Sequence, residues 1–155
     1  MSYLRWVVRT KRHPSAILLL VQLAGMVLYP FIESTDAGRI AFGVFGIVVL
    51  IITTGMVRFT PGLTWVSVCI AAPAIVMLAL QAMFGMPQLL VASSALEAVF
   101  YFYAAGSLIS YMLKDRRATT DELFAAGATF TLLAWGFTYL FLLLQALQPG
   151  CFAAA

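Results

Sequence analysis

The chain has 155 residues, of which 63% are hydrophobic and 10% are charged, and its formal net charge is +3. Soluble domains carry about 25% charged residues, and soluble packing cannot hide this much apolar surface. The composition therefore excludes a soluble domain and predicts an all-α, polytopic membrane protein that forms a single membrane domain. The basic residues flank apolar segments, as the positive-inside rule requires, so we expect no nucleic-acid partner.

The first predicted helix covers residues 14–32 and follows a basic segment, residues 1–13. Residues 16–28 resemble the apolar core of a signal peptide, but no A-x-A cleavage site follows them, so we interpret this helix as a retained first span. The second predicted helix covers residues 39–57. Gly43 and Gly46 give it a small-residue face suited to close contact between helices in lipid, and we take both as candidate helix-packing positions.

The third predicted helix covers residues 63–84 and has Pro73 near its middle, where a proline usually kinks a helix. The fourth, residues 89–113, is the most polar span. It has no basic residue between Leu89 and Leu113. Because voltage sensing needs arginines spaced through one span, we expect no steep voltage dependence from these helices.

Glu97 is the one acidic residue well inside a predicted span. A charge near the membrane midplane costs about 2.5–3.5 kcal/mol on insertion scales, so this side chain needs an explanation. Two interpretations stay open: a contact for a proton or cation, or a polar anchor that is hydrogen-bonded to serine or tyrosine of a neighbouring helix. Glu97 is therefore the best candidate for an intramembrane polar site.

The fifth predicted helix covers residues 121–147 and begins with a capping box, Thr119 with Glu122 three residues later. The uncharged run from Leu123 to Leu147 rises about 37 Å as a helix, enough to cross a hydrocarbon core of about 30 Å with some tilt. Small residues at its start, including the candidate packing position Gly127, predict a free face that another protein covers. We therefore expect a homo-oligomer or a complex with other membrane subunits.

The topology follows from counting charges. Eight of the nine basic residues fall on the side of the N-terminus, and Arg39 alone falls on the other side. Five spans with a cytoplasmic N-terminus and an outside C-terminus satisfy the positive-inside rule, whereas four or six spans would break it. The sequence thus predicts a multi-pass protein of the inner (plasma) membrane of the cell.

Residues with the usual chemistry of active sites are scarce. The single histidine, His13, lies beside basic residues at the predicted inner interface, and a metal or haem site in a bundle generally needs two or more facing ligands. The sequence contains no HExxH motif and no Gly-rich phosphate loop. Cys69 and Cys151 lie at different predicted depths, so a disulfide between them is not expected. We expect no enzyme, no catalytic residue, no metal and no cofactor.

Four features of the last helix occur together: an acidic cap at residues 120–123, small residues at 125–127, an aliphatic–aromatic run with Trp135, and QALQPGCF at 145–152. With LYPFIEST at 28–35 and the arrangement of spans, this pattern resembles bacterial ion-channel-like proteins of the two-helix pore (potassium-channel-like) superfamily. The resemblance implies that the last helix is the outer helix of a pore and that the first four form a peripheral module.

In that superfamily a selectivity filter and an inner helix follow the outer pore helix, and neither is present in these 155 residues. The resemblance therefore implies either further sequence beyond Ala155 or a channel relative that has lost its pore. The alternative function is a non-catalytic structural or accessory subunit of a larger respiratory or photosynthetic membrane complex.

Overall fold

The computed structural model describes residues 14–32, 36–57, 64–84, 87–113 and 119–152. Every regular element in these ranges is helical, which confirms the all-α fold class. The helices are α2 (Pro14–Ile32), α3 (Asp36–Val57), α4 (Thr64–Phe84), the short 3-10 helix η1 (Pro87–Leu89), α5 (Leu90–Met112) and α6 (Thr120–Leu147). The bounds of the five long helices lie within three residues of those expected from the sequence, and the short helix η1 was not expected. The basic N-terminal segment, with His13, lies outside the described residues.

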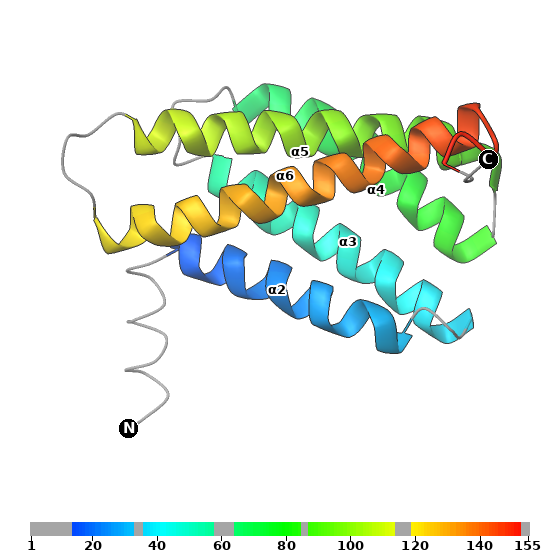
Figure 1. Cartoon of the computed structure of the whole chain (residues 1–155), viewed down its shortest axis with the longest axis horizontal. Coiled ribbons are helices and arrows are strands. Elements are labelled where there is room, and N and C mark those ends of the chain that lie inside the picture. The colour runs from blue at the N-terminus through cyan, green and yellow to red at the C-terminus, as the bar shows by residue number, and fades with distance from the viewer. Residues whose placement is uncertain (1–13, 33–35, 58–63, 85–86, 114–118, 153–155) are drawn as a thin grey trace.

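The five long helices form a closed ring of neighbours. Helix α2 packs on α3, α3 on α4, α4 on α5 and α5 on α6, and α6 returns to α2. The most extensive contact joins α5 to α6, and α3 also touches α5 across the ring. Figure 1 shows α6 lying along α5 and crossing toward α2 at its N-terminal end. Helices that are far apart in sequence, α2 and α6, are therefore direct neighbours.

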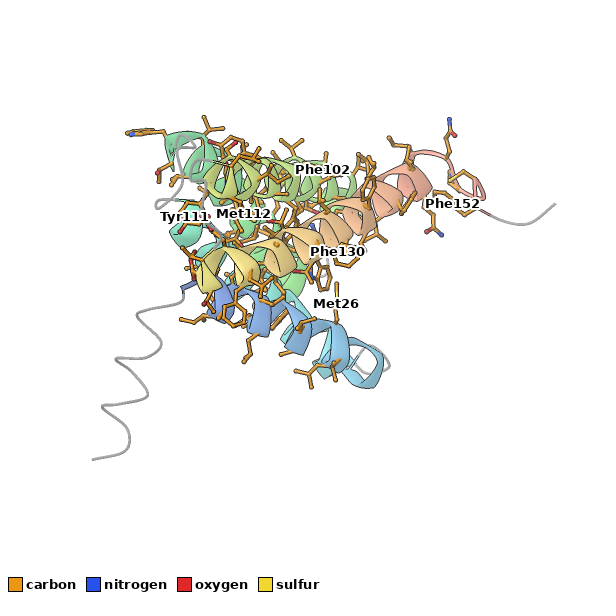
Figure 2. The ribbon with its side chains drawn as sticks, turned by 60° about the vertical axis from the view of Figure 1, so that its left-hand side comes forward. Met26, Phe102, Tyr111, Met112, Phe130 and Phe152 are labelled. Carbon is orange, nitrogen blue, oxygen red and sulfur yellow. The ribbon has the colours of Figure 1, made fainter. Side chains whose placement is uncertain are left out.

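Contacts between side chains fix the direction of each helix. Helices α2 and α6 run parallel, because Ser15 near the start of α2 donates to Asp121 near the start of α6, with 3.0 Å between Ser15 Oγ and Asp121 Oδ2. Consecutive helices run antiparallel; for example, Gln81 near the end of α4 donates to Ser93 near the start of α5, with 2.7 Å between Gln81 Nε2 and Ser93 Oγ. Helices α2, α4 and α6 therefore begin at one end of the bundle, and α3 and α5 begin at the other. Figure 2 shows Tyr111 at the first of these ends and Phe152 at the second.

Three of the helices, α4, α5 and α6, are long and apolar enough to cross a membrane by length and composition. Helices α2 and α3 contain shorter apolar stretches, Ser15–Leu28 and Val44–Gly55. The surface of the bundle carries many large apolar side chains, among them Leu20, Trp65 and Phe130, while Gln22, Thr53 and other polar side chains are buried. Polar groups inside and apolar groups outside are typical of a bundle surrounded by lipid.

Both ends of α6 are defined by local hydrogen bonds. The predicted capping box is confirmed: the backbone N–H of Glu122 donates to Thr119 Oγ1, and the backbone N–H of Thr119 donates to Glu122 Oε2 at 2.7 Å. At the other end, Gln148 N–H donates to Leu144 O. The chain then turns through Gly150, whose φ of 89° is in the left-handed region that glycine adopts without strain.

The small residues at the start of α6 pack inside the chain. Ala125 and Ala128 are fully buried, and a Cβ added to Gly127 would lie 3.0 Å from Leu19 Cδ2 of α2. The expectation that this face is free for another protein is therefore wrong for these residues. Small side chains let two helix backbones approach closely, and here the close neighbour is α2 of the same chain.

Candidate functional site

Glu97 lies in the interior of the bundle, on the face of α5 that meets α6. Its side chain is 1% exposed. Ser93, Glu97 and Tyr101 follow one another at intervals of four residues, so they share one face of α5, and all three are buried. α5 is the most polar of the spans, and this spacing gathers its polar side chains on one face. Neighbouring helices cover that face, so α5 is also the most enclosed span.

The carboxyl group of Glu97 has a hydrogen-bond partner on the neighbouring helix. The hydroxyl of Tyr139, on α6, donates to it. The other carboxyl oxygen, Oε2, is buried and has no hydrogen-bond partner among the described residues. Glu97 therefore joins α5 to α6 through one oxygen and keeps an unused acceptor in the interior.

Aromatic rings hold Tyr139 in position. Its ring stacks on that of Tyr101, with the centroids 5.6 Å apart and the planes inclined by 7°. Trp135, one turn earlier in α6, lies with its ring centroid 6.5 Å from that of Tyr139, and Phe100 meets Tyr101 edge to face. Because such pairs contribute about 0.5–1.5 kcal/mol beyond the area that they bury, contacts with Tyr101 and Trp135 help to hold the phenol that contacts Glu97 in place.

A small cavity adjoins this cluster, where α3 crosses α5 and α6. Its volume is about 10 Å³, and it is lined by Phe45, Gly46, Val49, Tyr101, Trp135 and Tyr139. A cavity of this size is about the smallest that can hold one water molecule. Gly46 of α3 lines this cavity and also faces α4. A Cβ added to Gly46 would lie 3.7 Å from Leu78 Cδ1. The other glycine proposed for packing, Gly43, lies in α3 outside the residues whose surroundings are described.

The surroundings of Glu97 offer no compensating charge within the described structure. The described side chains of α2, α3 and α4 include no Asp, Glu, Lys, Arg or His. On α6, Asp121 and Glu122 lie at the opposite end, about 26 Å along the helix from Tyr139. The site thus consists of one carboxyl group, two phenols and an indole around a space of about one water molecule.

Two further polar side chains of α6, Thr131 and Asp121, form hydrogen bonds to its neighbours nearer the start of the helix. The Thr131 hydroxyl is hydrogen-bonded to the side-chain amide of Gln22 on α2, and both side chains are buried. Asp121 accepts hydrogen bonds from the backbone N–H and from the hydroxyl of Ser15 on α2. It also accepts one from the hydroxyl of Tyr111 on α5. Polar contacts therefore connect α6 to α2 and α5 over much of its length.

Metal-binding groups do not gather anywhere in the described part of the chain. No cluster of three or more His, Cys, Asp or Glu side chains is found among these residues. Cys69 and Cys151 are free and exposed. Of the candidate site and packing residues predicted from the sequence, Glu97 belongs to the cluster of polar and aromatic groups, and Gly46 lines the adjoining cavity. Tyr139, the partner of Glu97, was not recognised as such, because it lies on a different helix.

Fold and site together define an all-helical protein with three helices able to cross a membrane and a carboxyl group buried between two of them. Comparison of the chain with protein-family models, with curated proteins and with solved structures gives no match.

Proposed function

We propose that this chain is the membrane module of an ion-channel-like protein, in which α2–α5 form a peripheral domain and α6 is the outer helix of a pore. The sequence pattern of α6 supports this proposal through its resemblance to the two-helix pore superfamily. The module crosses the bacterial inner membrane five times, with the start of α2 on the cytoplasmic side. At 19 and 22 residues, α2 and α3 rise about 28 Å and 33 Å, close to the hydrocarbon thickness of about 30 Å.

The observation that carries the proposal is the outward face of α6. Large apolar side chains recur on it every seven residues: Leu123, Phe130, Phe137 and Leu144 are 73%, 72%, 48% and 40% exposed. Figure 2 shows Phe130 on the outer side of α6. A seven-residue spacing places side chains in one seam along a helix, the arrangement by which a second helix packs on the first. In a channel-like protein the inner helix of the pore would cover this stripe.

Aromatic contacts keep the stripe in a fixed shape over its second half. The ring of Phe137 meets Phe102 of α5 edge to face, with centroids 5.2 Å apart. The Phe137 ring also stacks with that of Phe141, with the centroids 6.4 Å apart, and Phe141 meets Phe152 edge to face. A surface organised in advance costs less side-chain entropy when another helix docks on it, which suits a permanent contact inside a membrane assembly.

Ion flux tests the proposal. The protein is purified from its native membrane, reconstituted in lipid vesicles, and assayed for passive K⁺, Na⁺ and Cl⁻ flux with and without an imposed voltage. If the native protein includes a filter and an inner helix, it conducts these ions, and the fraction of open pores changes little with voltage, because α5 carries no basic residue. A folded preparation with no flux, isolated together with catalytic subunits of a larger complex, would favour the accessory-subunit function instead.

A further inference from the structure

We propose that Glu97 is a proton-binding site inside the bundle, and that release of its proton admits one water molecule to the cavity between α3, α5 and α6. This site is separate from the stripe on α6, so the inference does not depend on ion conduction. It rests on the buried carboxyl group, its single donor and the adjoining cavity.

A proton is the cation that this geometry accommodates. A metal ion needs a shell of several oxygen, nitrogen or sulfur ligands, and among the described residues there is no cluster of three acidic, histidine or cysteine side chains. The adjoining cavity, of about 10 Å³, is about the smallest space that holds one water molecule, and no acidic side chain lines it. A proton needs only one acceptor, and the buried Oε2 of Glu97 has no hydrogen-bond partner among the described residues.

The two protonation states place different demands on the surroundings. In the neutral state the carboxyl group carries no charge, so it can lie among Tyr101 and Tyr139 without a counter-ion. When the O–H bond breaks and the proton passes to water, a negative charge remains between α5 and α6. Tyr139 is the donor that faces this charge from α6, and a further donor to the Tyr139 oxygen would strengthen that hydrogen bond, because a buried charge is costly unless it is hydrogen-bonded.

The cavity supplies room for that donor. Tyr139 both bonds to Glu97 and lines the cavity, and Tyr101, one turn after Glu97, lines it as well. A water molecule there would lie against Trp135 and beside Tyr139, whose hydroxyl donates to Glu97; Glu97 itself does not line the cavity. The titratable groups near the carboxyl are thus the two phenols, since the described side chains of α2, α3 and α4 include no acidic residue and no Lys, Arg or His. Deprotonation therefore changes the contact between α5 and α6 by one charge and one water molecule.

Trp135 allows this change to be observed. The chain has three tryptophans, so replacing Trp6 and Trp65 by phenylalanine leaves Trp135 as the single indole. Its emission is measured in lipid nanodiscs from about pH 3 to about pH 9, because buried carboxyl groups titrate as high as about 8–9. Far-UV circular dichroism at each pH confirms that the helices stay folded.

We expect one sigmoidal change in the emission of Trp135, and Glu97→Gln abolishes it because glutamine cannot lose a proton. The control, Glu122→Gln, keeps the transition, since Glu122 lies at the far end of α6 and glutamine also serves in a capping box. Tyr139→Phe retains a transition at a different midpoint, because the carboxylate loses its phenol donor. This second variant keeps the test decisive if Glu97→Gln fails to fold.

Two results would overturn the inference. One is a transition that persists unchanged in Glu97→Gln or has the same midpoint in Tyr139→Phe. The other is a parent protein that shows no transition over the whole range while it remains folded.

Discussion

Gly25→Ala tests how closely α2 and α3 approach each other. A Cβ added at Gly25 would overlap the ring of Phe45 on α3. Phe45 is partly buried and packed against the hydrophobic core, so its ring would have to turn away from α2 and give up part of this packing. We therefore expect the substitution to force the two helices apart or to distort the ring.

The magnitude follows from two opposing effects. Overpacking a filled interior typically costs about 1–3 kcal/mol, while alanine in place of glycine favours a helix by about 1 kcal/mol. Gly55→Ala and Gly106→Ala provide matched controls, because a Cβ at either position meets no other atom within 4 Å. The helix preference is common to all three variants, so Gly25→Ala should be about 1–3 kcal/mol less stable than the controls.

Unfolding in mixed detergent micelles, followed by circular dichroism as the denaturing detergent is increased, measures these differences. The expected order places both controls at or above the parent protein and Gly25→Ala below them. Equal stability of Gly25→Ala and Gly55→Ala would refute the close contact between α2 and Phe45.

Two other predictions concern α6 and the topology. Gly127→Leu should lower the stability of the isolated chain by about 1–3 kcal/mol, because Leu19 of α2 occupies the space that the new side chain needs; a variant that unfolds like the parent and loses only oligomers would instead make Gly127 an intermolecular contact. Cys151 should react with a membrane-impermeant maleimide added outside intact cells, in a Cys69→Ser background, because five spans leave the end of α6 outside. Labelling of Cys151 in lysates alone would reverse that orientation.

The helices could be predicted well because their ends carry local signals. The capping box at Thr119 and Glu122 marked the start of α6, and the polar breaks between apolar runs marked the other boundaries to within three residues. Glu97 could be found as well, since an acidic residue within an apolar span stands out in the sequence. Its burial against another helix agrees with the high cost of a charge in lipid.

The arrangement of the helices could not be predicted in the same way. Each helix is apolar on nearly every face, so hydropathy alone does not show which face points inward. Polar spacing would have been a better guide: Ser15 and Gln22 on α2, seven residues apart, and Ser93 and Glu97 on α5 all face the interior. Pairing of Glu97 with Tyr139 requires knowing that α5 and α6 are antiparallel neighbours, which no local pattern encodes.

A pore helix and a helix that simply faces lipid differ in what covers the stripe of exposed side chains on α6. A nitroxide label at Phe130→Cys, in a Cys69→Ser and Cys151→Ser background, reports whether protein or lipid covers this face in the native membrane. Val76→Cys on α4 is the control, because Val76 is 57% exposed. Val76 lies about 18 Å from the start of α4, and Phe130 lies about 15 Å from the start of α6. Because both helices begin at the same end of the bundle, the two labels are at similar depth.

Oxygen, which concentrates in lipid, broadens the spectrum of a label that lipid surrounds. If α6 is the outer helix of a pore, the label at position 130 is immobilised and protected from oxygen, while the label at position 76 is mobile and accessible. Equal mobility and equal oxygen accessibility at the two positions would contradict the assignment of α6 as a pore helix.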